Sequence, residues 1–200
     1  MPRQATPGLR EGWYARFGKR ALDLIITLPV TILLAPVAVV VSALIRAEDR
    51  GPAIFRQERV GAGGRFFTLR KFRTMPIDTP NVPSGDAHQL RVTRIGRLLR
   101  RTSLDEIPQL LSVVAGDMTL VGPRPAIPQQ EGLIRLRSRN GSLDLKPGLT
   151  GLAQVNSYDG MPEEAKARWD GEYATTMSLC GDARILVRTI GYLTRKPPQY

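Results

Sequence analysis

A long apolar run dominates the first quarter of the chain. From Ala21 to Ile45 most side chains are apolar, and Asp23 is the only charged residue. These 25 residues exceed the roughly 20 that a helix needs to cross the hydrocarbon core of a membrane. The run is too long for a cleaved signal peptide. The pattern therefore predicts a membrane-associated helix over residues 21–46.

Two features of this run favour a bend over a straight span. Pro29 and Pro36 lie inside it, and each removes a backbone hydrogen-bond donor. Basic residues also flank the run on both sides, and such residues favour the cytoplasmic side of a membrane. They are Arg10, Arg16, Lys19 and Arg20 before it, and Arg46, Arg50, Arg56 and Arg59 after it. We therefore predict a re-entrant helical hairpin bent near Pro36, with a straight span as the alternative.

Beyond residue 46 the pattern becomes that of a compact, basic globular region. The stretches Ala53–Val60 and Arg65–Phe72 are rich in Ile, Phe and Val, which predicts two short strands. The glycine-rich residues 61–64 between them predict a hairpin turn. A turn-rich loop is expected from Pro76 to Gly85. The chain thus divides into a basic N-terminal arm (1–20), the membrane helix (21–46) and a folded domain (47–200).

Two amphipathic helices are predicted within the folded domain. The first covers Arg91–Arg101, and its apolar and basic residues fall on roughly opposite sides at about 100° per residue. Its basic side consists of Arg94, Arg97 and Arg101. This side is either an ordinary solvated face or a face toward an anion. The second helix covers Asp182–Arg195, and it either lies on anionic lipid or packs on the core.

The stretch Ser103–Pro108 allows two interpretations. Ser103 and Glu106 have the spacing of a capping box at a helix start, with Asp105 merely complementing the helix dipole. Alternatively, the stretch is chemical, because a helix start also accommodates phosphate. Adjacent carboxylates among many arginines could hold a hard cation such as Mg²⁺.

A second candidate site follows at Val121–Pro125. Pro123 and Pro125 restrict the backbone on both sides of Arg124. The segment is either a stiff loop or one that fixes how Arg124 approaches a phosphate. Arginine suits the second role because its planar group binds two oxygens at once. Another turn, Lys146–Gly151, lies further along.

Composition narrows the range of partners. The 200 residues include 29 Lys plus Arg against 18 Asp plus Glu, a net charge of +11 that favours anionic partners. One cysteine, Cys180, excludes an intrachain disulfide, and one histidine, His88, excludes a site built from several histidines. A membrane-tethered nucleic-acid-binding protein is one interpretation. Against it, aromatic residues make up only 6% and do not alternate with the basic ones.

These stretches together resemble the small monotopic bacterial phosphoglycosyl transferases, also called bacterial sugar transferases. The resemblance spreads from residue 19 past residue 156. It rests on Lys19-Arg20 with Asp23, the Pro36 break, Leu69–Met75, Arg100–Pro108, Gly116–Met118, Val121–Pro125 and Lys146–Asn156. Since no further apolar spans come before these stretches, we expect the minimal form of the family.

The resemblance implies both a fold and an activity. The fold is α+β and mainly α, with a re-entrant membrane helix, a small β-hairpin and interfacial amphipathic helices, and residues 47–200 form the catalytic domain. The activity is transfer of a sugar 1-phosphate from a UDP-sugar to polyprenyl (undecaprenyl) phosphate, with Mg²⁺, through a covalent aspartyl intermediate. This reaction would initiate cell-surface glycan assembly. The expected place is the cytoplasmic face of the bacterial inner membrane, in contact with membrane lipid and without nucleic acid.

The resemblance also assigns roles to residues. Asp105 matches the nucleophile and is the expected metal ligand, and Glu106 matches its catalytic partner. Lys71, Arg100 and Arg124 match the substrate-binding basic residues. The chain departs from the family at Asn156-Ser157-Tyr158, where Asn-Gly-Arg is frequent, so the sugar is left unassigned.

Overall fold

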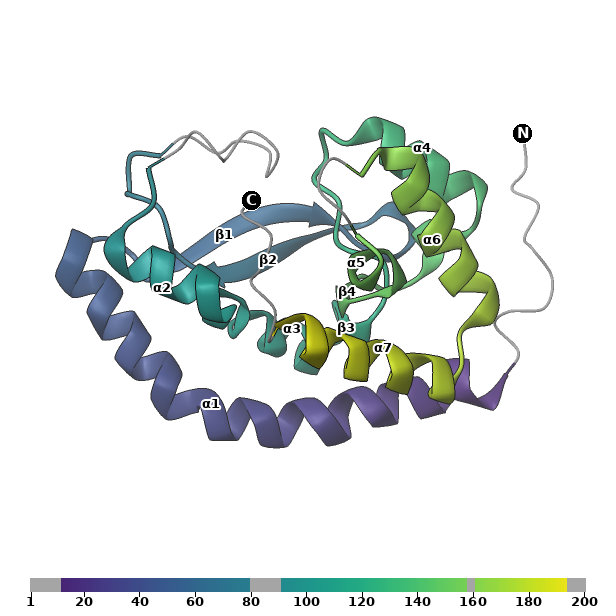
Figure 1. The fold of residues 1–200 in the computed structure, drawn as a ribbon, viewed down its shortest axis with the longest axis horizontal. Coiled ribbons are helices and arrows are strands. Elements are labelled where there is room, and N and C mark those ends of the chain that lie inside the picture. Colours follow the sequence, from purple (N-terminus) through teal and green to yellow (C-terminus); the bar gives the residue numbers. More distant parts are fainter. Residues whose placement is uncertain (1–11, 80–90, 158–160, 194–200) are drawn as a thin grey trace.

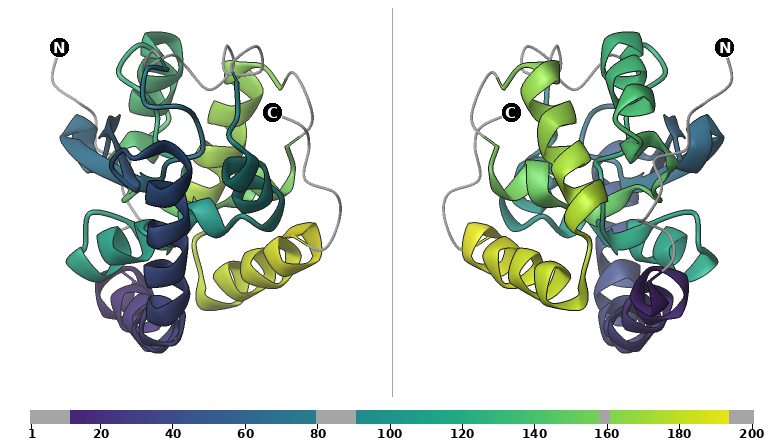
Figure 2. Two further views of the ribbon diagram at one scale, coloured as in Figure 1. Left: turned by 90° about the vertical axis from the view of Figure 1, so that its left-hand side faces the viewer. Right: turned by 90° about the vertical axis from the view of Figure 1, so that its right-hand side faces the viewer.

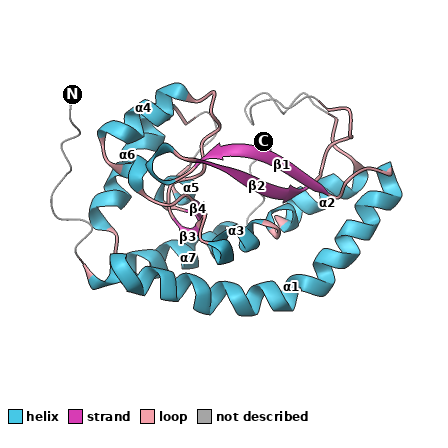
Figure 3. Cartoon of the chain, turned by 180° about the vertical axis from the view of Figure 1, so that it is seen from behind, coloured by secondary structure: helices cyan, strands magenta, loops and turns pink. Residues whose placement is uncertain are grey.

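The computed structural model describes residues 12–79, 91–157 and 161–193, which form a mostly helical molecule with two small sheets (Figures 1 and 3). The predicted class, mainly α with a β-hairpin, is confirmed at this level. Figures 1 and 2 show α1 and α7 along one side of the molecule and α4 on the opposite side.

The apolar run forms one helix. A short π-helix, η1 (Tyr14–Gly18), leads into α1 (Lys19–Asp49), which has 31 residues and contains both prolines. Figure 1 shows that α1 bends along its length. The predicted hairpin is therefore present only as a bend within one continuous helix, and its re-entrant course in a membrane stays a prediction. Each proline removes a single hydrogen bond, and the bonds on either side of it continue the helix.

Much of the apolar surface of α1 remains uncovered. Exposed side chains occur along nearly its whole length: Ile25, Leu28, Ile32, Leu33, Val37, Val39, Val40 and Leu44. Within the described ranges, the helical stretch Tyr14–Asp49 is the one long and apolar enough to cross a membrane. Large apolar patches left exposed in this way mark an interaction surface.

The predicted hairpin of strands is present almost residue for residue. Strand β1 (Ile54–Val60) pairs antiparallel with β2 (Phe66–Phe72), from Ile54 opposite Phe72 to Val60 opposite Phe66. The turn contains a 3₁₀ segment, η2 (Ala62–Gly64). Gly63 and Gly64 there have φ values of 65° and 80°, which glycine adopts without steric cost.

A second sheet was not predicted from the sequence. Strands β3 (Thr119–Val121) and β4 (Gly148–Thr150) pair in parallel. Strands of three residues carry almost no periodicity, and this pairing depends on glycine. A Cβ on Gly148 would lie 2.1 Å from the backbone nitrogen of Gly122, so only glycine allows the two segments to approach so closely.

The remaining helices surround these sheets. They are α2 (Arg94–Thr102), η4 (Leu104–Glu106), α3 (Gln109–Ala115), α4 (Glu131–Arg139), η5 (Ser142–Asp144), α5 (Leu152–Val155), α6 (Glu163–Thr176) and α7 (Leu179–Leu193). Both predicted amphipathic helices are present as α2 and α7. Residues 80–85 of the predicted loop, His88, Tyr158 and Arg195 lie outside the described residues.

The main core lies between β2, α3, β3, α6 and α7. Its buried members are Leu69, Val113, Met118, Leu120, Val121, Tyr173 and Ile185. Helix α7 contributes Ile185 to this core and leaves Val187 and Ile190 about two-thirds exposed, at 69% and 65%. Core packing is therefore confirmed for one side of this helix, and contact of its exposed side with anionic lipid stays a prediction.

Polar groups attach the beginning of α1 to the folded domain. The Lys19 ammonium lies 2.6 Å from the buried Asp182 carboxylate of α7. Arg20 donates to the carbonyl oxygens of Val113 and Val114 at the end of α3, at 2.6 and 2.7 Å. Buried Asp23 accepts from the Thr119 hydroxyl at 2.7 Å and from the Leu120 amide at 2.9 Å.

The end of α1 is attached to the same domain. The Glu48 carboxylate accepts hydrogen bonds from the backbone amides of Arg94 and Ile95, at 2.7 and 3.1 Å. Asp49 lies 3.2 Å from the guanidinium of buried Arg73, just after β2. Both ends of α1 are therefore held by one globular domain.

Candidate active site

The candidate site lies where the end of β2, the turn η4 and the loop after β3 meet. Lys71 of β2 donates a hydrogen bond from Nζ to Glu106 Oε1 at 2.6 Å. The same Nζ lies 4.0 Å from Asp105 Oδ2. One ammonium group thus serves two adjacent carboxylates, bonded to the second and near the first.

The capping-box interpretation of Ser103 is wrong. Ser103 ends α2 with a left-handed φ of 55°, and its side chain makes no capping bond to the turn that follows. The Glu106 side chain, which the capping box would turn back to Ser103, is bonded to Lys71 instead. A charge-assisted bond is roughly twice as strong as a neutral one, so the long-range partner wins over the local one.

The two carboxylates have pKa values displaced in opposite directions. Burial raises the pKa of Asp105, and the negative charge of Glu106 adds to this, against Lys71 and Arg100. Burial also opposes ionisation of Glu106, but the charges of Lys71 and Arg124 outweigh it and lower its pKa to about 2. Two neighbouring acids tuned apart in this way are typical of an active site.

Arg124 follows β3, and its loop is held at four successive carbonyl groups. The Pro123 oxygen accepts from the Gly148 amide at 2.8 Å, and the Ala126 oxygen accepts from the Val60 amide at 2.9 Å. The Arg124 oxygen itself accepts from Arg137 Nη1 at 2.8 Å. The Pro125 oxygen accepts from Arg59 Nη1 at 3.1 Å. The backbone is therefore fixed while the Arg124 side chain remains exposed.

The support of Arg124 continues into the core. Arg137 of α4 is buried, and it forms an ion pair of 2.7 Å with the buried carboxylate of Asp170 on α6. Its Nε donates to the same carboxylate at 2.8 Å. The guanidinium thus binds Asp170 with one edge and the Arg124 carbonyl with a remaining donor. Neither Arg137 nor Asp170 was found by sequence reasoning, because they are 33 residues apart.

Two further arginines border the site. Arg100 of α2 is half-buried, and its Nε donates to the Thr74 hydroxyl at 3.0 Å. Burial lowers the pKa of Arg100, and Asp105 opposes this. Arg59 of β1 was missed, because nothing in the strand pattern distinguishes it from Arg56. Burial and the charge of Arg124 together lower the pKa of Arg59 to about 10, against the opposing charge of Glu106.

The structure therefore brings all five predicted site residues into one electrostatic neighbourhood: Lys71, Arg100, Asp105, Glu106 and Arg124. The predicted arginine face of α2, formed by Arg94, Arg97 and Arg101, does not belong to this group of residues. Arg94 and Arg97 line a separate cavity at the other end of this helix, and Arg101 is exposed.

The donor set restricts how a metal ion could bind. Across residues 12–79, 91–157 and 161–193, no three His, Cys, Asp or Glu side chains gather to hold one. A cage built from protein alone does not fit. Mg²⁺ is, however, often held by one or two carboxylates together with phosphate oxygens and waters. Asp105 fits this mode, because its nearest cation is 4.0 Å away while Glu106 is bonded to Lys71.

Comparison with known proteins gives a consistent result. The sequence profile described as bacterial sugar transferase matches residues 14–196. The chain is 41% identical over 181 residues to the UDP-glucose:undecaprenyl-phosphate glucose-1-phosphate transferase of Caulobacter vibrioides, covering 86% of this chain and 68% of that protein. It is 37% identical to the UDP-galactose-lipid carrier transferase of Erwinia amylovora, covering 93% of this chain and 42% of that protein.

A protein from a third bacterium gives the same picture. The chain is 34% identical to the UDP-glucose:undecaprenyl-phosphate glucose-1-phosphate transferase of Escherichia coli strain K12, covering 88% of this chain and 40% of that protein. The chain therefore spans about two-fifths of the length of the Erwinia and Escherichia proteins.

Proposed function

The chain belongs to the bacterial sugar transferase family, and on this premise we propose that it transfers a sugar 1-phosphate from a UDP-sugar to undecaprenyl phosphate and releases UMP. Membership makes the chain a transferase, which favours the enzyme over the nucleic-acid-binding interpretation. The activities for which these relatives are named support a UDP-hexose donor and an undecaprenyl phosphate acceptor. The product would be the first lipid-linked sugar of a cell-surface glycan.

One observation carries the proposal. A half-buried carboxylate with a raised pKa, Asp105, lies beside a second carboxylate that Lys71 and Arg124 keep ionised. Arg124 reaches the same place from a loop fixed at four carbonyl groups. Phosphoryl transfer depends mainly on positioning and on screening of negative charge, and this arrangement supplies both.

In the first step, a carboxylate oxygen of Asp105 attacks the β-phosphorus of the UDP-sugar. The bond from this phosphorus to the bridging oxygen breaks, and UMP leaves with the electron pair. Asp105 then carries the sugar phosphate as a mixed anhydride. Arg124 binds two phosphate oxygens with its planar fork, and Lys71 offsets the negative charge that gathers near Asp105.

In the second step, an oxygen of the lipid phosphate attacks the same phosphorus. The anhydride bond breaks, Asp105 regains its carboxylate, and the sugar leaves on a lipid diphosphate. Lys71 lies 4.0 Å from the departing carboxylate and favours its ionised form. Glu106 keeps this ammonium in place through its 2.6 Å bond. A covalent intermediate of this kind divides one difficult displacement into two easier steps.

Mg²⁺ is the cofactor we propose for this site. Asp105 would hold it together with oxygens of the donor diphosphate, and the ion would supply screening of phosphate charge. Glu106 is a weaker candidate ligand because Lys71 already occupies it.

We also propose that α1 enters and leaves the membrane by the same face, the cytoplasmic face of the inner membrane. Both ends of α1 bind one domain, through Lys19, Arg20 and Asp23 at the start and Glu48 and Asp49 at the end. A straight span of 31 residues would place these ends about 45 Å apart on opposite sides. The bent, apolar and exposed course of α1 supports a re-entrant helix (Figure 1).

The test uses the full chain in nanodiscs with undecaprenyl phosphate and a panel of UDP-sugars. We expect Mg²⁺-dependent UMP release with at least one donor. Donor labelled in the sugar should leave label on the denatured wild-type protein when acceptor is absent, and Asp105→Asn should abolish both signals. Undiminished turnover of Asp105→Asn would refute the nucleophile. UMP release without trapped label, and with intersecting rather than parallel initial-rate lines, would indicate direct attack by the lipid phosphate.

A further inference from the structure

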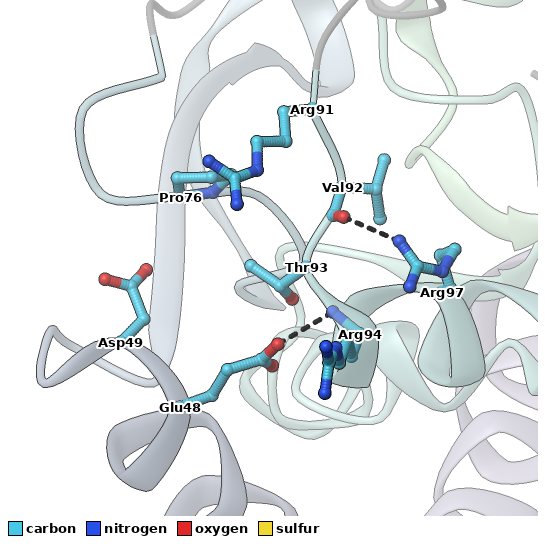
Figure 4. Close-up of a pocket in the computed structure, with 8 residues that line it drawn as sticks. All are labelled: Glu48, Asp49, Pro76, Arg91, Val92, Thr93, Arg94 and Arg97. Atoms are coloured by element: carbon cyan, nitrogen blue, oxygen red, sulfur yellow. Dashed lines mark hydrogen bonds between the residues drawn. The ribbon is translucent and has the colours of Figure 1, made fainter.

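A charged cavity lies at the beginning of α2, away from the candidate active site. It has a volume of about 390 Å³ and is formed where α1 ends and α2 begins (Figure 4). Three arginines line it, Arg91, Arg94 and Arg97, together with two carboxylates, Glu48 and Asp49.

Both carboxylates of the cavity are already engaged. Glu48 accepts from the backbone amides of Arg94 and Ile95 (Figure 4 draws the first of these bonds), and Asp49 pairs with buried Arg73. The arginines that line the cavity form no ion pair with any side chain in the described part of the chain. Glu48 keeps its negative charge while it accepts these amide bonds, and Asp49 is paired with Arg73, so the three arginines leave the cavity with a net positive charge.

One of these arginines is held in position. Arg97 Nη1 donates to the Val92 carbonyl oxygen at 3.1 Å (Figure 4). This bond leaves other N–H donors of the guanidinium free. A guanidinium fixed in this way loses less conformational entropy on binding an anion than a freely rotating one.

The cavity is distinct from the catalytic groups. Arg94 and Arg100 are six residues apart in α2, which corresponds to about 9 Å along the helix axis. The Arg100 side chain is bonded to Thr74 and interacts with Asp105. It therefore belongs to the site at the other end of this helix.

The position of the cavity identifies its ligand. Along α1 the exposed apolar residues end at Leu44, and the charged residues Arg46, Glu48 and Asp49 follow within one and a half turns. Such a transition marks the level of the lipid headgroups. We infer that this cavity binds the phosphate of an acidic phospholipid headgroup and so fixes the catalytic domain at the membrane surface. The inference rests on the membrane association in the proposed function.

The experiment counts lipids bound to the full chain in a neutral detergent by native mass spectrometry. Dihexanoyl phosphatidylglycerol is the probe, and wild type should bind it saturably. The Arg94→Gln/Arg97→Gln double variant should weaken binding at least about tenfold, since it removes charge-assisted phosphate bonds. Arg101→Gln, on the same helix but outside the cavity, should weaken binding less than about twofold. Arg91 also lines the cavity but lies outside α2. The Arg91→Gln variant therefore removes a cavity charge without altering that helix.

Two further probes separate the sources of the phosphate. If inorganic phosphate binds more weakly than dihexanoyl phosphatidylglycerol, the ligand of the cavity is a lipid headgroup. If the two bind equally well, the ligand is a soluble phosphate in the same site. Equal losses in Arg101→Gln and the double variant would overturn the inference in favour of a diffuse basic face. Arginine-independent binding of dihexanoyl phosphatidylcholine, as tight as that of phosphatidylglycerol, would also overturn it. UMP release by the wild-type protein is measured separately. Absence of UMP release would refute the proposed function and leave the lipid-binding result standing.

Discussion

Arg124 is the residue whose geometry is most strongly determined by its surroundings. Its backbone is fixed at four carbonyl groups, and its side chain forms no ion pair with the described residues. We expect Arg124→Lys to fold normally and to lower kcat/KM about 10- to 100-fold. Lysine keeps the charge but loses the fork, and a hydrogen bond to a charged group contributes about 1.5–3 kcal/mol. Steady-state UMP release with thermal unfolding as the folding control measures this, and near wild-type turnover would refute two-oxygen binding.

Arg137 acts on the site through Arg124, and a double-mutant cycle separates this role from simple stability. Arg137→Lys should keep a pair with Asp170 but lose the bond to the Arg124 carbonyl. We expect kcat/KM to fall about tenfold in the wild-type background, a change that corresponds to the free energy of one such hydrogen bond. In the Arg124→Lys background it should fall much less, while the loss of thermal stability stays the same. Equal losses of activity in both backgrounds would indicate a purely structural role.

The two carboxylates predict a specific pH dependence. Asp105 attacks only when ionised, so turnover should fall as the pH falls through its raised pKa. The acid limb of kcat/KM should therefore lie above the ordinary aspartate value of about 3.9. Glu106→Gln removes a like charge and frees Lys71, and both changes lower the pKa of Asp105. The acid limb should move to lower pH, with less loss of turnover than in Asp105→Asn.

The matched control for this experiment is Glu58→Gln, an exposed residue of β1, which should leave the limb in place. A limb that stays fixed in Glu106→Gln, or moves upward, would show that Asp105 is not the group that titrates.

At the scale of residues, the sequence alone predicted the site residues that are neighbours in the chain. It did not predict those that only the tertiary fold brings together. The Arg124 motif and the Asp105–Glu106 pair are contiguous, so their residue types alone suggest phosphate chemistry. Arg59, Arg137 and Asp170 are each unremarkable in their own segments, and only the tertiary fold gives them a role. The wrong capping box at Ser103 has the same origin, since Lys71 is 35 residues away from Glu106.

At the scale of elements, helical periodicity predicted α2 and α7, each of which buries one side against the core, and richness in Ile, Phe and Val predicted β1 and β2. Periodicity failed for β3 and β4, because strands of three residues carry almost none of it and their close approach depends on Gly148. It also failed to settle the shape of α1. Prolines indicate where a helix is weakened, but the packing of its two ends decides whether it bends or folds back.

The bend of α1 is testable through the sign of a stability change. Pro36 lies between buried Thr27, in the first part of α1, and Val41 and Ile45, which pack with Phe72 and Leu99. If the bend were incidental, Pro36→Leu would stabilise the protein, because proline costs about 3 kcal/mol in a helix interior. We expect destabilisation instead, because a straight α1 withdraws Val41 and Ile45 from their cluster, at about 1.5–3 kcal/mol for each side chain fully exposed.

Pro29→Leu is the control for this prediction. Pro29 lies close to Thr27 in the same attached part of α1, so its replacement should not separate the two ends. Thermal unfolding in nanodiscs gives the measurement for both variants. A higher melting temperature for Pro36→Leu would show that the stability of the fold does not depend on the bend at Pro36.

At the scale of the whole molecule, the two attachments of α1 lead to one prediction about topology. The start of α1 is bonded to α3, β3 and α7, and its end is bonded to α2 and to Arg73 after β2. One compact domain cannot bind both ends from opposite sides of a bilayer. Both ends should therefore lie on the cytoplasmic side, in agreement with the basic residues that flank the apolar run.

Cysteine labelling of the full chain in spheroplasts measures this topology. In a Cys180→Ser background, Arg16→Cys and Ala47→Cys place one thiol at an exposed position near each end of α1. Neither thiol should react with a membrane-impermeant maleimide from outside, and both should react after permeabilisation. Glu164→Cys, exposed on α6, is the control for the domain itself and should behave in the same way. Labelling of Arg16→Cys from outside, with Ala47→Cys protected, would show that α1 spans the membrane. The bonds of Lys19 and Arg20 to the domain could then not form together with those of Glu48 and Asp49.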